Sequence, residues 1–429
     1  MPINLLWLAL FVSASGAFGS WDVGPELNRE LKEQTDGRVQ VVFEFRSRAE
    51  SRGGQSFGID PDLVADFVRT RVGVRLQPAS WLRITATGMD ARAPWYGRNA
   101  PGSARDPFDL HELTFELRPA AKTGFGASFG RLPANYGDTR LIGSPAWAYI
   151  TRIYDGGRAW YRWKRLRLEA LLLAPVKTDG TRWNRPVMGD RVEGMYNTIF
   201  FPRKASLEFY VLRHHQNRPG GYTGLGRFIT DSFGAHLFGP LANGFRYNLE
   251  GVAQTGKIGA LEHRAHAWVV QVGKQTTVLN RQFDAYAEYK FASGEHRVDR
   301  SGAFDQIYPA AHDKFGHADL IGWRNNRNLR VAAIWSVSKA VTLNAMYNNT
   351  WLADARDALY STAGRAIARS AAGTAGTHVG QEADLYGSYR RSGFTIGAGY
   401  GQFFSGEFIR KTTPNVTPHY LYIFQSYTF

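Results

Sequence analysis

Apolar and polar side chains alternate residue by residue over most of this chain. Leu207, Phe209 and Val211, for example, fall on one side of an extended backbone, and Glu208 and Tyr210 fall on the other. Successive side chains of a β-strand point to opposite faces, so this period of two predicts strands with one apolar and one polar face. The 3.6-residue period of an amphipathic helix is not the dominant pattern.

We predict about eighteen such strands, at 39–50, 63–77, 80–92, 109–118, 123–131, 151–163, 165–176, 192–201, 204–215, 229–239, 243–255, 262–272, 280–292, 327–337, 340–351, 378–390, 393–405 and 418–429. The segments between them alternate in length. Short ones lie at 77–80, 119–123, 202–205, 240–244, 337–340 and 390–393, and long ones at 93–108, 132–150, 177–191, 216–228, 293–326, 352–377 and 406–417. Segment 256–261 is the poorest fit, because it is shorter than the other long ones. This alternation is typical of an up-and-down membrane barrel, with short periplasmic turns and long extracellular loops.

The polar faces of the strands carry many charges. Along 63–77, Val68 and Val72 share one face, while Arg69, Arg71 and Arg75 share the other. So many charged side chains cannot be buried in a dry core. They can be hydrated in a water channel, and about eighteen strands close a barrel wide enough to hold one. We therefore predict an all-β fold, a transmembrane antiparallel up-and-down β-barrel in the bacterial outer membrane.

The N-terminus has the form of a secretory signal peptide. An apolar run from Ile3 to Val12 leads into small residues that end near Gly19, and such a run is too short to span a bilayer. We predict a signal peptide at 1–19 and a single outer-membrane barrel domain at 20–429. No later segment is long and apolar enough for a transmembrane helix.

The composition adds a strong positive charge to this picture. Lys and Arg number 52 against 37 Asp and Glu, which gives a net charge of +15, and cysteine is absent. Without cysteine the chain forms no disulfide. A basic protein attracts nucleic acid, anionic lipid or an acidic solute. The signal peptide argues against nucleic acid, so the expected partners are outer-membrane lipid, including lipopolysaccharide, and an anionic solute.

The last predicted strand, HYLYIFQSYTF, ends the chain at Phe429, with Tyr427 two residues before it. A terminal Phe after alternating aromatic residues resembles the assembly signal of bacterial outer-membrane barrels. We therefore expect the outer-membrane assembly machinery to bind this strand.

The stretch from Gly130 to Arg158 carries the clearest motif, GRLPANYGDTRLIGSPAWAYITRIYDGGR. It resembles the alginate export family of outer-membrane porins. The family pattern G-R-x-x-x-x-Y-G-[DE]-x-R-L-I-G is met from Gly130 to Gly143, and R-x-[FY]-D-G-x-R is met from Arg152 to Arg158. Further similar segments are Arg46–Glu50, Asp109–Glu112, Phe304–Asn325 and Gly401–Phe408. The resemblance implies an eighteen-stranded barrel with an arginine-rich pore that passes an anionic uronate polymer such as alginate.

Arginines on the inward faces are the candidate functional residues. An arginine binds a carboxylate through two parallel hydrogen bonds and stays charged at any working pH, and a ring of basic side chains favours anions in a pore. The predicted solute path consists of Arg46, Arg48, Arg69, Arg71, Arg75, Arg83, Arg131, Asp138, Arg140, Arg152, Asp155 and Arg158. The aspartates would hold the arginines in place and weaken solute binding. The alternative for each residue is a structural ion pair that braces the wall.

We predict a porin that passes an anionic polysaccharide or oligosaccharide, with no catalytic residue, cofactor or metal. A porin for small organic anions is the alternative with the same fold. An outer-membrane barrel enzyme is less favoured, since it requires a Ser-His-Asn or Asp-His arrangement at one rim and no local motif supplies one. A metal site at His214 and His215 is also disfavoured, because adjacent residues of a strand face opposite sides.

Overall fold

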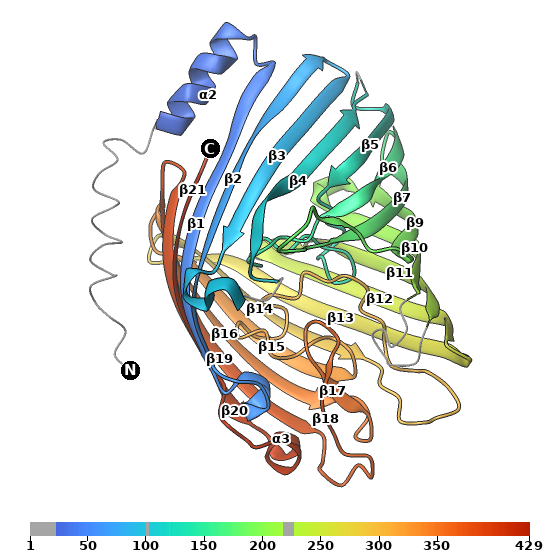
Figure 1. The fold of residues 1–429 in the computed structure, drawn as a ribbon. Coiled ribbons are helices and arrows are strands. Elements are labelled where there is room, and N and C mark those ends of the chain that lie inside the picture. Colours follow the sequence, from blue (N-terminus) through green and yellow to red (C-terminus); the bar gives the residue numbers. More distant parts are fainter. Residues whose placement is uncertain (1–22, 100–102, 120, 218–226) are drawn as a thin grey trace, which may run out of the picture.

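One antiparallel sheet closes on itself to form a barrel (Figure 1). The computed structural model describes residues 23–99, 103–119, 121–217 and 227–429. Within these residues eighteen strands follow one another around the wall, and β21 pairs with β1 to complete the ring. The predicted barrel is thus confirmed. The predicted signal peptide, 1–19, lies outside the described residues.

Every wall strand overlaps a predicted range. The first nine are β1 (Val39–Gly53), β2 (Leu63–Ala79), β3 (Leu82–Arg92), β4 (Asp106–Leu117), β5 (Gly124–Leu132), β6 (Tyr154–Trp163), β7 (Leu166–Lys177), β9 (Asp190–Phe200) and β10 (Ser206–Gln216). The other nine are β11 (Phe228–Pro240), β12 (Phe245–Ile258), β13 (Leu261–Val278), β14 (Arg281–Ala292), β15 (Asn326–Ser336), β16 (Val341–Leu352), β19 (His378–Arg391), β20 (Phe394–Ser405) and β21 (His419–Thr428). The short strands β8 (Arg185–Pro186), β17 (Ala358–Tyr360) and β18 (Ala366–Arg369) belong to loops.

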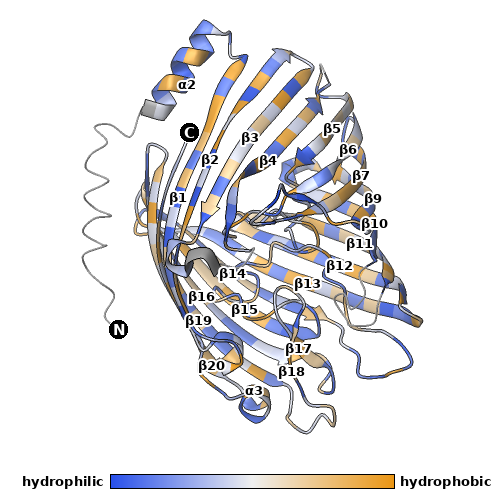
Figure 2. Ribbon diagram, viewed as in Figure 1, coloured by the Kyte–Doolittle hydropathy of each residue, from blue (hydrophilic) through white to orange (hydrophobic). Residues whose placement is uncertain are grey.

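The barrel has its apolar side chains outside and its polar side chains inside. On β16, Leu343 is 41% exposed and Tyr347 is 38% exposed on the outer face, while Asn348 and Thr350 are buried on the inner face. The same alternation of hydrophobic and hydrophilic positions runs along the other strands in Figure 2. A lipid-facing exterior and a polar lumen are what this pattern requires of a membrane barrel.

The connections sort by length between the two ends of the barrel. The tight turns include 164–165, 279–280 and 392–393, and they lie at the end where β1 begins and β21 finishes. The long connections lie at the opposite end, together with β17, β18 and α3 (Glu407–Thr412) (Figure 1). The connection between β12 and β13 is shorter than predicted and consists of residues 259–260.

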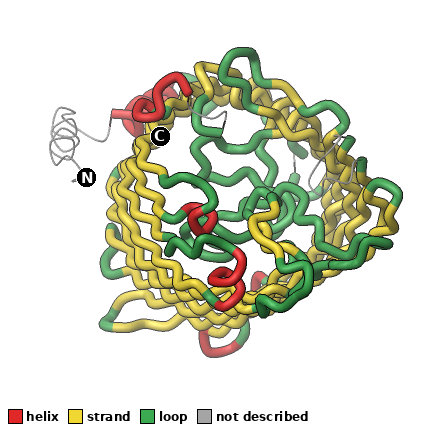
Figure 3. The backbone as a smooth tube through the Cα atoms, turned by 60° about the horizontal axis from the view of Figure 1, so that its bottom comes forward, coloured by secondary structure: helices red, strands yellow, loops and turns green. Residues whose placement is uncertain are grey.

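Two of the long connections fold back into the barrel, and we call them the inner loops. They comprise residues 133–153, between β5 and β6, and residues 293–325, between β14 and β15. Coil segments occupy much of the ring of strands in Figure 3. The inner loops pair in parallel at Ile142 and Tyr308, where Gly143 N donates to Tyr308 O at 2.9 Å and Tyr308 N donates to Leu141 O at 2.8 Å. Their buried apolar side chains, which include Leu141, Ile142 and Phe304, account for the inward folding.

The helical segments are short. The helix α2 (Val23–Gln34) is fixed to β1 by Asn28, whose side chain both accepts from Val41 N and donates to Val41 O at 2.9 Å. The 3₁₀ turns are η1 (Gln55–Gly58), η2 (Pro94–Asn99), η3 (Pro202–Lys204) and η4 (Ala242–Gly244). Among the helices in the described residues, none has the length and apolar character needed to cross a membrane.

Candidate functional site

The arginines of β1 reach into the lumen and bind the backbone of the first inner loop. Arg46 donates to Ala146 O and to Trp147 O, both at 2.7 Å. Arg48 donates to Trp147 O at 2.7 Å and is 2% exposed. Strand alternation places both side chains on the inner face, and the loop supplies carbonyl oxygens that would otherwise be unpaired.

The arginines of β2 continue this row. Arg69 donates to Ala148 O at 2.8 Å and also pairs with Glu44. Arg71 lies 3.2 Å from Glu44 and donates to the Thr151 hydroxyl. The antiparallel register of β1 and β2 places Arg46 opposite Arg69 and Glu44 opposite Arg71. Four of the five predicted arginines of β1 and β2 therefore form one continuous basic surface, which we call the arginine wall; they are Arg46, Arg48, Arg69 and Arg71.

Trp147 lies at the centre of this wall. Its ring is 4.1 Å from the guanidinium carbon of Arg48 and 4.8 Å from that of Arg46, measured to the ring centroid. On its other side it stacks on His312 at 4.9 Å and packs edge-on against Phe424 at 5.4 Å. Cation–π contacts favour a charged guanidinium over the face of the indole, so Trp147 fixes the loop to the arginines and both inner loops to each other.

Glu50 is the main buried anion of the arginine wall. It pairs with Arg48, accepts from Arg52 at 2.9 Å and from the Tyr420 hydroxyl at 2.9 Å, and also accepts from the Tyr149 hydroxyl. The carboxylate thus accepts three hydrogen bonds and has two cationic partners, which is how a buried charge is stabilised.

Arg152 holds the two inner loops together from within. Its Nη1 donates to Gly143 O at 3.2 Å, to Tyr308 O at 2.9 Å and to Pro309 O at 3.0 Å. Carbonyl groups satisfy its donors and leave its charge uncompensated. Arg152 therefore adds to the positive field of the lumen while it joins the loops.

Arg140 and Asp138 lie against the opposite wall. Arg140 Nη2 is 2.5 Å from Glu288 on β14, and its Nε is 3.9 Å from Glu250 on β12. Asp138 accepts from Asn248 at 2.6 Å and lies 3.7 Å from Arg140. Burial opposes the charged form of Arg140, but the attraction of Glu288, Asp138 and Glu250 outweighs it and raises the pKa of Arg140 above its ordinary value.

The other predicted residues lie apart from the arginine wall. Arg75 donates to Gln40 at 2.8 Å and Arg83 lies 3.6 Å from Glu116. Both are on the inner face, nearer the end with the short turns. Arg158 is on the inner face of β6, and its guanidinium carbon is 6.0 Å from the Trp160 ring.

Arg131 and Asp155 pair with each other. Arg131 Nε is 2.7 Å from Asp155, and Arg131 also donates to Asn184 O at 3.0 Å. Arg131 shares its strand parity with Phe129, which is 49% exposed on the outer face. The Arg131 side chain is nonetheless only 11% exposed, and the pair lies beneath the loop that contains Asn184 and is not part of the arginine wall.

A cavity of about 620 Å³ lies between the arginine wall, β4 and the inner loops. Its lining includes the basic residues Arg48, Arg52 and Arg152 and the acidic residues Asp106 and Asp319. Six arginines lie on this side of the lumen, and their ion-pair partners among the described residues are Glu44 and Glu50. The six are Arg46, Arg48, Arg52, Arg69, Arg71 and Arg152. This side of the lumen is strongly electropositive.

Acidic side chains of other strands also contact the inner loops. Glu169 on β7 accepts from the Tyr136 hydroxyl at 2.5 Å, and Glu382 on β19 accepts from Ala318 N at 2.8 Å, close to Arg52, which donates to Ala318 O. Across the lumen, Glu288 is balanced by Arg140 and by Lys290, whose Nζ is 2.9 Å away. The lumen therefore has an arginine side and a mixed side, with an electric field across it.

Some residues of this arrangement were missed by the sequence prediction. Arg52 continues the alternation of Arg46, Arg48 and Glu50 by one more step, so extending the predicted strand beyond residue 50 would have found it. Glu288 was placed on a polar face, but its partner Arg140 is 148 positions away in sequence. Such a contact follows from loop folding, for which the pattern carries no signal.

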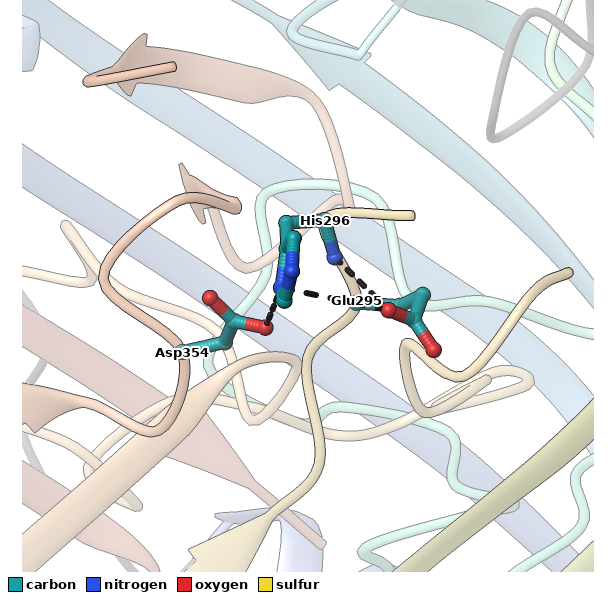
Figure 4. Close-up of side chains that lie close together, drawn as sticks. All are labelled: Glu295, His296 and Asp354. Carbon is teal, nitrogen blue, oxygen red and sulfur yellow. Dashed lines mark hydrogen bonds and ion pairs between the residues drawn. The ribbon is translucent and has the colours of Figure 1, made fainter. Parts of the chain in front are cut away.

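The histidine groups are structural within the described residues. His214 is 1% exposed and lies 2.8 Å from Asp305 and 3.3 Å from Asp190. At the outer end, Glu295, His296 and Asp354 lie close enough to bind one metal ion (Figure 4). Each has a protein partner as well, since His296 Nδ1 is 2.6 Å from Asp354 and Glu295 accepts from Arg297 N at 3.0 Å.

A closed barrel with an apolar exterior, a polar lumen and loops folded into that lumen is an outer-membrane porin. The sequence profile described as alginate export matches residues 38–422. The chain belongs to the alginate export family, and its location is the bacterial outer membrane. This family is one of porins and not of enzymes.

Solved porins share this fold at low sequence identity. OccK2 (OpdF) of Pseudomonas aeruginosa, in a crystal structure with glucuronate, is 10% identical with a TM-score of 0.64, over 91% of this chain and 98% of that chain. OpdQ of the same species is 11% identical with a TM-score of 0.63, over 91% of this chain and 97% of that chain. A BenF-like porin of Pseudomonas fluorescens Pf-5 is 9% identical with a TM-score of 0.61, over 91% and 98%. Comparison with curated proteins gives no match.

Proposed function

We propose that this porin passes an anionic solute, and that the solute is a carboxylated saccharide such as alginate or its oligomers. The observation that carries the proposal is the arginine wall beside the 620 Å³ cavity. With Arg52 and Arg152, the four arginines of the wall bring six positive charges to this side of the lumen, and their ion-pair partners among the described residues are Glu44 and Glu50.

The contacts of these arginines support a role in solute passage as well as in structure. Arg46, Arg48 and Arg152 use their donors largely on backbone carbonyls, and a carbonyl does not neutralise a guanidinium charge. The remaining positive field acts in a confined space, where the effective dielectric constant is lower than in bulk water. Anions are therefore attracted without being bound so tightly that they cannot leave.

Two comparisons agree with this choice of solute. The profile that the chain matches is described as alginate export, and the similar barrel OccK2 was solved in complex with glucuronate, a sugar acid. Uronates carry one carboxylate on each sugar unit, so a chain of them presents a regular row of charges to a row of arginines.

A porin for small organic anions is a second candidate that one observation favours. The cavity volume of about 620 Å³ falls within the range of ordinary small-molecule sites. A small acid would fit such a space as well as a segment of a polymer.

Block of single-channel current in planar bilayers tests the proposal. We expect a uronate pentamer added to the bath to interrupt the current, with weaker block at high salt because the charges are screened. Current that is interrupted by small dicarboxylates and not by uronates would favour the second candidate. Current unaffected by any anion would contradict both.

We also propose that the assembly machinery of the outer membrane binds β21, and that lipid, including lipopolysaccharide, covers the apolar outer face. Phe429 stacks on Phe43 at 5.2 Å at the seam of the barrel. Removal of Phe429 should lower the amount of assembled barrel in cells relative to removal of the α2 segment, and equal losses would contradict this role.

A further inference from the structure

A second cavity, of about 780 Å³, lies at the end of the barrel with the long loops, between residues 293–325 and residues 353–377. We call it the outer cleft. Arginine is its most frequent charged residue. The arginines that line it are Arg297, Arg300, Arg324, Arg365 and Arg369, and the acids are Glu295 and Asp357.

Buried contacts form the floor of the outer cleft. Arg324 is 4% exposed, and its guanidinium carbon lies 4.6 Å from the Tyr360 ring centroid. The Tyr360 hydroxyl donates to Asp357 at 2.8 Å, and Asp357 also accepts from Glu295 N at 3.0 Å. The two loops are thus fastened to each other beneath the cleft.

The rim of the outer cleft carries exposed charges. Arg297 is 44% exposed in its side chain and lies 3.8 Å from Glu295. Arg365 is 54% exposed and pairs with Asp60, which is outside the cleft. Arg369 Nε donates to Arg356 O at 2.8 Å, a contact that leaves its charge uncompensated. Exposed ion pairs are weak and exchange with other anions.

The position of the outer cleft connects it to the inner cavity. Ala363, at the tip of the β17–β18 hairpin, lines both cavities. Leu261, which begins β13, lines the outer cleft on the side where the outer connection is only residues 259–260. The short connection between β12 and β13 leaves this side of the outer cleft open to the bulk solvent. The cleft therefore borders on both the solvent and the inner cavity.

We propose that the outer cleft is a binding site for the carboxylates of a short saccharide segment at the extracellular mouth, separate from the arginine wall. This inference rests on the proposed anionic solute. The volume suits a segment of a few sugar units and not a folded partner. The exposed arginines raise the local concentration of the anionic chain and pass it toward the cavity beyond Ala363.

Side-specific block in planar bilayers tests the site. The variant R297Q/R365Q/R369Q removes three charges at the rim and keeps the buried Arg324. The control variant R356Q/R410Q/K411Q removes three charges from exposed outer-loop positions that do not line the cleft. The probe is a uronate pentamer, added first to the extracellular side and then to the periplasmic side.

We expect the cleft variant to lower the association rate of the extracellular probe by about tenfold, the lower end of the range for electrostatic steering. The control variant should change it by less than about twofold, and the periplasmic association rate should be unchanged in both. Equal association rates for the cleft and control variants would overturn the site.

The permeability ratio of chloride to potassium, measured on the same channels, separates this inference from the proposed function. If the parent porin prefers chloride and the probe associates with both variants at equal rates, the binding site at the outer cleft is contradicted and the proposed function is not. A parent that prefers potassium contradicts the proposed function. A loss of extracellular rate confined to the cleft variant supports the cleft in either case.

Discussion

At the residue scale, Trp147 joins the first inner loop both to the arginine wall and to the second inner loop. Two guanidinium groups cover it, and it stacks on His312. Each cation–π contact contributes roughly 0.5–2 kcal/mol, depending on its exposure. Trp147 therefore helps to fix the position of both inner loops, together with Arg152 and the carbonyl contacts of the arginine wall.

W147A should loosen the first inner loop and raise both the conductance and the open-channel noise, because the two cation–π contacts are lost. Single-channel recording measures both quantities. W183A is the control, since Trp183 is 69% exposed in an outer loop. Conductance and noise equal to those of the control would show that Trp147 does not fix the loop.

His317 makes the second inner loop sensitive to acid. Its Nε2 is 2.8 Å from the Tyr422 hydroxyl, and its ring stacks on Tyr386 at 4.4 Å. Burial and the nearby His312 lower the pKa of His317 to about 3, from its ordinary value of 6.5, although Asp313 and Asp319 oppose this shift. The neutral ring is the form that the folded loop holds.

Acid should therefore release this loop. A released loop binds the proton at the ordinary pKa, so the folded loop is fully stable above pH 6.5 and loses stability as the pH falls toward 3. At pH 5 the loss is about 2 kcal/mol. We expect gating events to increase between pH 6.5 and 5 in single-channel recordings, and to be independent of pH in H317Q. An equal increase in both proteins would assign the effect to other groups.

At the element scale, the strands act as two-sided surfaces. Phe209 and Leu343 are 37% and 41% exposed on the outer face of β10 and β16. F209K or L343K should destabilise the barrel by roughly 2–4 kcal/mol if the site lies near the bilayer midplane. Unfolding in urea from lipid vesicles measures this loss. N344K, on the inner face of β16, is the control, and equal losses from both faces would contradict the assigned orientation.

The loops divide into exposed and inserted parts. In the second inner loop, Arg297 and Arg300 are exposed, whereas Arg324 is 4% exposed. Trypsin added to intact cells should cleave after Arg297 or Arg300 and spare Arg324. It should also spare Lys204, in a short turn on the periplasmic side, until the barrel is purified. Mass spectrometry of the fragments checks both sites, and cleavage after Lys204 on intact cells would reverse the orientation.

The strands could be predicted from the sequence, because a period of two is a local property of neighbouring residues. Glu44, Arg46 and Arg69 share the inner face for that reason. The contacts between Arg48 and Trp147, or between Arg140 and Glu288, could not be predicted, since they depend on two loops that fold back into the lumen. Arg131 shows the limit most clearly, because the motif that marked it gives no signal for its contact with the Asn184 carbonyl, 53 positions away.

At the scale of the whole molecule, charge is distributed unequally around the lumen. Arginines of β1 and β2 collect on one side, while Glu288 on the other side is balanced by Arg140 and Lys290. The apolar exterior and the paired seam of β1 and β21 make the barrel a stable frame for this field. Selectivity for anions is thus expected to be a property of one side of the lumen.

The reversal potential across a KCl gradient tests this claim most directly. The parent porin should show a potential of the sign set by chloride. R71Q/R75Q/R83Q removes three inward charges. Only Arg71 of the three contacts an inner loop, through the Thr151 hydroxyl, to which Arg69 also donates, so the loops should stay in place while the potential moves toward zero. A parent potential of the sign set by potassium, or an unchanged potential in the triple variant, would contradict the account.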